Sequence, residues 1–135
     1  MAVSNHTPEF IYKIGGEYML NYNQKQLIYE NNLSSTEEVK NFKMEGEGAI
    51  SFPKNRLRME SLLGEDKGQK ANIVYWCPQE FPANFMIEWD FWPIKEPGLC
   101  ILFFCAKGRN DEDIFDPELE KRTGKYSQYH HGDIN

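Results

Sequence analysis

Two features are scarce in this 135-residue sequence: basic side chains and long apolar runs. The 15 Lys and Arg are outnumbered by 21 Asp and Glu, which gives a formal net charge of −6. This balance argues against a nucleic-acid or anionic-membrane partner, because such partners bind basic patches. No run reaches the roughly 18 apolar residues of a membrane span, and the N-terminus lacks the apolar stretch of a signal peptide. We therefore expect a cytoplasmic protein that binds neither nucleic acid nor membranes.

Cysteine is also scarce, and the three residues present indicate neither a disulfide nor a metal site. Cys100 and Cys105 are five positions apart, so on one strand they face opposite sides and cannot pair locally. Cys77 falls on a different predicted strand. Reduced thiols are the simplest account, and no Cys-x-x-Cys spacing indicates zinc. We expect no metal and no cofactor.

Aromatic residues, in contrast, make up 14% of the chain, with three Trp and seven Tyr. The length fits one domain with a real core. An aromatic-rich sequence suits a sugar-binding surface, because the apolar faces of pyranose rings stack on flat side chains. It also suits the core of an ordinary β-sandwich. On composition alone, the ordinary core is favoured over the sugar-binding surface.

Residues 85–107 are predicted to form two strands joined by a proline-bounded turn. The first, FMIEWDFW, alternates with period two, which is typical of a strand with one face in a core. The alternation places Phe85, Ile87, Trp89 and Phe91 on the core face and Met86, Glu88, Asp90 and Trp92 on a solvent or ligand face. The second, GLCILFFCAK, is apolar on both faces, so we expect it deep in a sheet with packing above and below.

Turn signals divide the preceding sequence into further short strands. FIYKI and EYML flank a Gly15-Gly16 turn, and QLIYENNL follows. GAISF and RLRMES flank a second turn at 53–55, with Leu57 and Met59 expected to point inward. ANIVYWC gives another strand, and one short helix is expected near Ser35 to Asn41, docked by Val39 and Phe42. The pattern predicts an all-β sandwich or jelly roll.

Residues 108–135 contain no strand-like run. Loops of this length inside a compact domain are usually functional or disordered. Apolar anchors along it, such as Ile114, Phe115 and Leu119, favour an ordered, functional loop.

The loop motifs GRNDEDIFDP and KRTGKYSQYHHGDIN resemble the YesU-like family, a bacterial domain of unknown function. The resemblance extends back through WDFWPIKEPGLCILFF, VYWCPQEFP and MEGEGAISF, and covers about Leu27 to Asn135. It implies a concanavalin-like jelly-roll sandwich and a link to the use of plant polysaccharides. Members continue past the GDIN segment, so we expect residues 27–135 to be the first part of a single domain whose C-terminal strands are absent. Residues 1–26 would be an N-terminal hairpin extension, and the missing half of the domain is a candidate partner.

Acidic and indole side chains share the predicted ligand face. Glu88 and Asp90 lie two positions apart on one strand, and paired carboxylates can serve as acid and base in glycoside hydrolysis. The Glu-x-Asp-x-x-Glu pattern of jelly-roll glucanases fails here, because Pro93 occupies the last position. Trp92 lies on the same face and Trp76 could come up beside it, as in a sugar groove, although half-buried packing is an equal alternative.

The loop supplies the remaining candidate residues. His130 could act as a general base, oriented by Asp133 and close to Tyr129, facing Asp90 and Trp76 across the sheet. His131 is the rival, because neighbouring residues of an extended stretch point opposite ways. Arg109 and Asp113 would brace the loop against the sheet.

These observations predict a carbohydrate-active protein whose partner is an oligosaccharide or polysaccharide fragment. The catalytic candidates are His130, Asp133, Asp90 and Tyr129, and the ligand-binding candidates are Trp76, Glu88, Trp92, Arg109 and His131. A glycoside hydrolase or polysaccharide lyase acting on plant glycans is the leading interpretation. A non-catalytic carbohydrate-binding module and a structural sandwich without a ligand are the alternatives.

Overall fold

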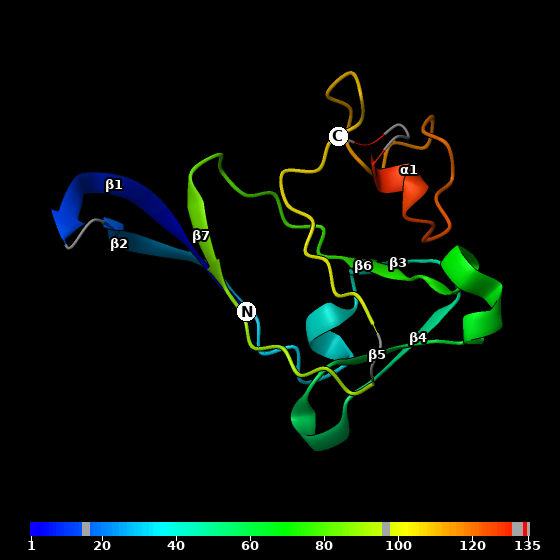
Figure 1. Cartoon of the computed structure of the whole chain (residues 1–135). Helices are drawn as coiled ribbons and strands as arrows, with labels where there is room; N and C mark the ends of the chain where they lie inside the picture. The colour runs from blue at the N-terminus through cyan, green and yellow to red at the C-terminus, as the bar shows by residue number, and fades with distance from the viewer. Residues whose placement is uncertain (15–16, 96–97, 131–133, 135) are drawn as a thin grey trace. The chain divides into compact units, whose positions relative to one another are not determined.

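The computed structural model describes residues 1–14, 17–95, 98–130 and 134, and the regular structure within them consists mainly of antiparallel strands (Figure 1). The strands are β1 (Ala2–Ile14), β2 (Glu17–Glu30), β3 (Lys43–Glu45), β4 (Gly48–Ser51), β5 (Arg58–Ser61), β6 (Val74–Trp76) and β7 (Phe85–Glu88). The helical turns are the 3-10 segments η1 (Glu37–Val39), η2 (Pro53–Asn55) and η3 (Glu65–Ala71), and the four-residue α1 (Ser127–His130). No helix in these residues is long and apolar enough to cross a membrane.

The chain divides into two compact units. The first comprises Met1–Asn32 and Glu80–Cys100, and the second comprises Leu33–Gln79 and Ile101–Asn135. The first unit holds a sheet in the order β2-β1-β7, and the second holds the pairs β3-β6 and β4-β5. Every pair is antiparallel, so the predicted all-β class is confirmed.

The first unit is organised by the long β1–β2 hairpin. Its register runs from Ile14↔Glu17 to Ala2↔Glu30, so β2 includes the QLIYE stretch that we expected to be a separate strand. The predicted Gly15-Gly16 turn lies outside the described residues. β7 pairs with the other side of β1, from Asn5↔Phe85 to Ala2↔Glu88. β1 is therefore the central strand of this sheet.

The second unit contains the most buried side chains of the described residues. Val39 in η1 is only 2% exposed, and Phe42 packs on Tyr75 with ring centroids 5.3 Å apart. Both were expected to dock the short helix, and the structure confirms this. The Ser34 hydroxyl and backbone N–H donate to the Glu38 carboxylate, which fixes the start of the turn.

The β4–β5 hairpin forms as predicted, with η2 as its turn, but Met59 does not point inward as expected. Met59 is exposed, whereas Arg58 is half-buried and donates to Glu60 at 2.5 Å. Alternation defines two faces of a hairpin, but only the packing of distant segments decides which face is covered.

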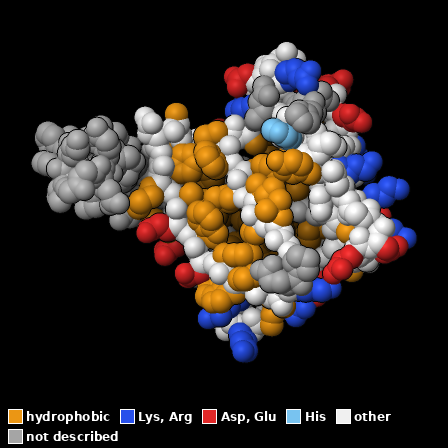
Figure 2. Space-filling model, in the orientation of Figure 1, with side chains coloured by type: hydrophobic (Ala, Val, Ile, Leu, Met, Phe, Trp, Pro, Cys, Tyr) orange, Lys and Arg blue, Asp and Glu red, His pale blue; other side chains and the backbone are white. Residues whose placement is uncertain are grey.

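The region around residues 85–107 departs most from the prediction. β7 ends at Glu88, and Trp89 and Phe91, both predicted on the core face, are about half exposed. Residues 98–107 were predicted to be a buried strand, yet no β-ladder of the described residues includes them. Leu99 is 84% exposed and Phe104 66% exposed. Figure 2 shows apolar side chains in orange on the face in view. This prediction is wrong, because apolar composition alone does not supply the neighbouring strands that a buried strand needs.

Candidate functional site

An open depression lies where the three strands of the first unit end together. Ala2 pairs with Glu30 of β2 on one side and with Glu88 of β7 on the other, so β1 begins between the ends of its two neighbours. The residues that continue beyond both strand ends complete a hollow of about 510 Å³. It is lined by Met1, Ala2, Glu30, Asn31, Asn32, Ile87, Glu88, Trp89 and Asp90. This volume falls within the range of small-ligand sites.

The lining of the depression combines acids with one indole. The side chains of Glu30, Glu88 and Asp90 are exposed, and the Trp89 side chain is 49% exposed. Carboxylates accept hydrogen bonds from hydroxyl groups, and an indole face packs against C–H groups. A polyhydroxylated ligand with an apolar face matches this arrangement.

The structure brings together only part of the predicted ligand face. Glu88 and Asp90 line the same depression, but Trp92, exposed in the same unit, does not. Trp89 lines it instead, although we predicted it to lie in the core. The face assignment of Trp89 was wrong because β7 ends at Glu88, and strand alternation does not continue beyond the end of a strand.

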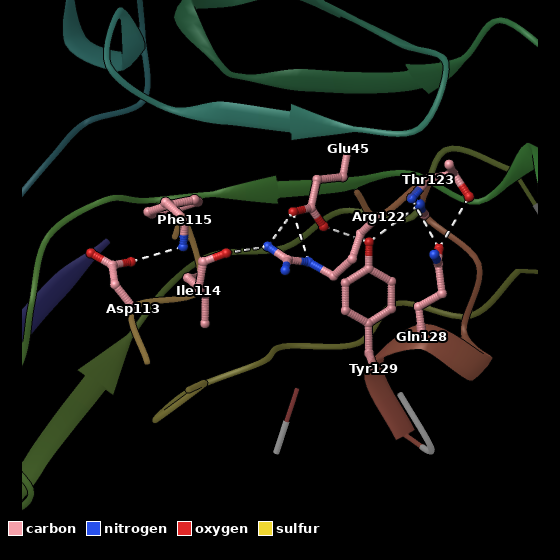
Figure 3. A network of polar contacts seen from close by, with 9 residues as sticks. Glu45, Asp113, Ile114, Phe115, Arg122, Thr123, Gln128 and Tyr129 are labelled. Atoms are coloured by element: carbon pink, nitrogen blue, oxygen red, sulfur yellow. Dashed lines mark hydrogen bonds and ion pairs between the residues drawn. The ribbon is translucent and has the colours of Figure 1, made fainter. Parts of the chain in front are cut away.

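A buried polar network ties the 108–134 loop to β3 in the second unit (Figure 3). Arg122 contacts Glu45 through its Nε at 2.9 Å and through a terminal nitrogen at 2.6 Å. The same guanidinium donates to the Ile114 carbonyl at 2.6 Å, and the Tyr129 hydroxyl donates to the second Glu45 oxygen at 2.5 Å. The Arg122 and Glu45 side chains are 8% and 13% exposed, so the pair is largely shielded from water. The loop is therefore ordered around one glutamate.

Two glycines allow the loop to approach the rest of this unit closely. Gly124 has φ +85° and Gly46 has φ +88°, values that side chains other than glycine rarely adopt. A Cβ atom at Gly124 would lie 2.2 Å from the Asn72 carbonyl oxygen, and one at Gly46 would lie 2.5 Å from it. The backbones of the loop, of the segment after β3 and of Asn72 therefore approach one another so closely that only glycine fits at positions 46 and 124.

An aromatic cluster lies beside the network. Trp76 is 7% exposed, and its ring centroid is 5.7 Å from that of Phe103 and 6.2 Å from that of Tyr129. The Phe103 and Tyr129 rings are 5.3 Å apart. We predicted Trp76 on an exposed, sugar-binding face, and that exposure is wrong. Phe103 and Tyr129 pack on the Trp76 ring and cover it.

The structure describes some of the predicted catalytic residues of the loop and not others. His130 is exposed at the end of α1, with its ring 5.6 Å from that of Tyr126, whereas the Tyr129 hydroxyl is enclosed in the Glu45 network. His131 and Asp133 lie outside the described residues. Asp90 belongs to the other unit, so its convergence with His130 stays a prediction.

The predicted bracing of the loop by Arg109 and Asp113 stays a prediction, and the contacts that the structure describes at the loop are others. Arg109 is exposed, and the Asp113 carboxylate accepts a hydrogen bond from the Phe115 N–H at 2.8 Å within the loop itself. The ion pair that fastens the loop joins Arg122 to Glu45, 77 positions earlier in the sequence, and sequence reasoning missed it. The described ranges contain no group of three or more His, Cys, Asp or Glu side chains that could hold a metal ion.

The Tyr129 network should make stability depend on pH in the alkaline range. Burial raises the pKa of the Tyr129 phenol, and the Glu45 carboxylate raises it further by accepting its hydrogen bond and repelling a phenolate. The folded protein then keeps a proton that the unfolded chain releases near pH 10. This contribution to stability is complete below about pH 10 and is lost as the pH rises further. We expect the melting temperature to fall more steeply above pH 10 in the native sequence than in Tyr129→Phe.

Tyr126→Phe is the matched control for this measurement, because the Tyr126 side chain is 40% exposed. It should keep the pH dependence of the native sequence. Parallel alkaline slopes for the native chain and Tyr129→Phe would contradict the assignment.

Comparison with known proteins identifies the relatives of this chain. A family model described as Domain of unknown function (DUF1961) matches residues 26–135. Uncharacterized protein YesU of Bacillus subtilis (strain 168) is 47% identical over 114 residues, which are 84% of this chain and 50% of that protein. A solved Bacillus subtilis structure, described as a protein of unknown function with a galectin-like fold, is similar with a TM-score of 0.65 and 44% identity, over 79% of this chain and 46% of the other.

These matches confirm the predicted sandwich architecture and the family resemblance. The chain spans about half the length of the relatives that it matches. On this evidence the chain belongs to the YesU-like family, the domain of unknown function DUF1961.

Proposed function

We propose that this protein binds carbohydrate and that the depression of the first unit forms part of the binding surface. The observation that supports this most directly is the position of Trp89 among three carboxylates, those of Glu30, Glu88 and Asp90. An apolar ring face beside several hydrogen-bond acceptors matches the two kinds of surface that a sugar presents. The galectin-like fold of the solved relative supports the same ligand class, because galectin-like sandwiches suit carbohydrate binding.

The ligand class can be narrowed by the charge of the depression. Its acidic side chains are Glu30, Glu88 and Asp90, and Lys and Arg are absent from its described lining. A uronate-rich chain would bring further negative charge to this surface and be repelled. We propose a neutral plant-derived oligosaccharide as the preferred ligand.

Glycoside hydrolysis is a second candidate function, favoured by one observation. Glu88 and Asp90 line the same hollow, and two carboxylates that flank a glycosidic bond can divide the roles of acid and base or nucleophile. Release of reducing ends from a bound oligosaccharide would distinguish hydrolysis from binding alone.

Replacement of Trp89 by alanine should weaken glycan binding at least tenfold, a loss of about 1.4 kcal/mol in binding free energy. The reason is that this substitution removes the one aromatic ring that lines the depression among the described residues. Isothermal titration against a panel of neutral plant oligosaccharides measures the change.

Trp92→Ala is the matched control. Trp92 has nearly the same exposure, 53% against 49% for Trp89, and lies in the same unit without lining the depression. It should change the affinity by less than about twofold, well below the tenfold loss expected for Trp89→Ala. A larger loss in Trp92→Ala than in Trp89→Ala would restore the ligand face predicted from alternation. Absence of binding to every neutral glycan would overturn the proposal.

A further inference from the structure

Three side chains of the depression lie in one row across the sheet of the first unit. Ala2 of β1 is paired with Glu30 of β2 and also with Glu88 of β7. Residues directly opposite one another on antiparallel strands place their side chains on the same face of the sheet. Because β1 lies between β2 and β7, the small Ala2 side chain lies between the two acids of this row.

Hydrogen bonds hold the row in register at the start of β1. The Met1 nitrogen donates to the Asn31 carbonyl at 2.9 Å, and the Asn31 N–H donates to the Met1 carbonyl at 2.9 Å. These reciprocal bonds continue the β1–β2 ladder one pair beyond Ala2 and Glu30. The pairing of Ala2 with Glu30 is therefore supported on both sides along the strand.

Aromatic contacts of neighbouring residues show which face the row occupies. Tyr29 precedes Glu30 in β2, and its ring centroid is 5.7 Å from that of Phe81. Phe85, the first residue of β7, stacks on the same Phe81 ring at 5.8 Å. Tyr29 and Phe85 are an odd number of positions from Glu30 and Glu88 respectively, so strand alternation places the acids on the opposite face. Both carboxylates therefore lie on the face that Phe81 does not cover.

The two carboxylates of the row are available as acceptors. The Glu30 and Glu88 side chains are exposed, and neither makes a hydrogen bond or ion pair with the described residues. Neighbouring strands lie about 4.8 Å apart, so about 10 Å separates the Glu30 and Glu88 backbones across β1. Ala2 lines the depression between them and contributes only a methyl group. The interval stays open because residue 2 is small.

We propose that Ala2 determines the specificity of the depression, and that Glu30 and Glu88 bind the two edges of one hexopyranose ring placed over the Ala2 methyl group. This inference rests on the proposed carbohydrate binding and names its substrate class. Within a β-1,4-linked chain, a hexopyranose carries hydroxyls on one edge and a hydroxymethyl group on the other, so it offers a donor to each carboxylate. A xylopyranose lacks the hydroxymethyl group and offers a donor on one edge only. We therefore expect hexose chains to bind more tightly than pentose chains.

Isothermal titration of the full chain with hexamers of β-1,4-linked glucose, mannose, galactose and xylose tests this preference. The best hexose hexamer should bind at least fivefold more tightly than the xylose hexamer. Ala2→Leu should weaken binding of that hexose hexamer at least tenfold, because the branched side chain occupies the interval between the acids. Glu30→Ala and Glu88→Ala should each weaken it at least fivefold.

Ala2→Ser is the matched control for Ala2→Leu, because serine is also small, and it should keep the affinity within twofold. Glu120→Ala controls for the loss of one negative charge, since Glu120 is exposed and lies in the second unit. It should leave the affinity unchanged. Intact mass confirms that all variants begin at the same residue, and circular dichroism confirms that they are folded. If Ala2→Leu does not fold, the two glutamate variants decide the outcome.

The results separate this inference from the proposed function. Glycan binding that requires Trp89 but is unchanged in folded Ala2→Leu, or in both glutamate variants, would overturn the inference and leave the proposed function standing. Equal affinity for the xylose hexamer and the best hexose hexamer would do the same. Absence of binding to every neutral glycan would overturn both.

Discussion

Replacement of Arg122 by alanine is expected to lower the free energy of unfolding by about 3–5 kcal/mol. Arg122 and Glu45 are 8% and 13% exposed, so removal of the guanidinium leaves a carboxylate in a poorly hydrated site with no paired cation. The substitution also deprives the Ile114 carbonyl of its donor. Urea unfolding followed by tryptophan fluorescence and by circular dichroism measures the change.

Lys67→Ala is the control for this experiment. Lys67 and Asp66 form an ion pair at 2.7 Å, but their side chains are 53% and 70% exposed. Because solvent screens such a pair, its loss should change the free energy of unfolding by no more than about 0.5 kcal/mol. Similar effects of the two substitutions would show that the Arg122–Glu45 pair does not hold the loop.

Replacement of Trp76 by alanine is also expected to lower the free energy of unfolding by about 3–5 kcal/mol. Trp76 is 7% exposed and packs on Phe103 and Tyr129. Its indole nitrogen is buried and makes no hydrogen bond to the described residues, so the cost comes from the lost burial of the ring and the cavity left in the aromatic cluster rather than from a lost hydrogen bond. Equilibrium urea unfolding followed by circular dichroism gives the difference without depending on the fluorescence of the removed indole.

Trp89→Ala is the control for Trp76→Ala, because it truncates a tryptophan that is exposed rather than buried. Trp89 is 49% exposed, and its truncation should cost less than about 1 kcal/mol while it weakens glycan binding. Strict alternation predicted the reverse, with Trp89 in the core and Trp76 on the ligand face. A larger loss of stability from Trp89→Ala than from Trp76→Ala would support the alternation-based assignment, with Trp89 in the core and Trp76 on the ligand face.

Local sequence patterns predicted the elements that depend on a few neighbouring residues. The antiparallel pairing of β1 with β2 and the β4–β5 hairpin agree with the β-forming stretches read from the sequence. The η1 turn follows from a polar start and from Val39, which the structure buries. In the site, Glu88 and Asp90 both line one depression, but Asp90 lies beyond the end of β7, so strand spacing alone does not account for its position.

Only the tertiary structure decided which faces are covered and which distant residues meet. Glu45, Arg122 and Tyr129 are separated by up to 84 positions, and no periodicity relates them, so their network was not predictable from the sequence. Trp76 and Trp89 occupy similar alternating patterns, yet one is buried by Phe103 and Tyr129 and the other lies beyond the end of β7. The physical reason is that alternation is a local property of the backbone, whereas burial depends on contacts between segments far apart in the chain.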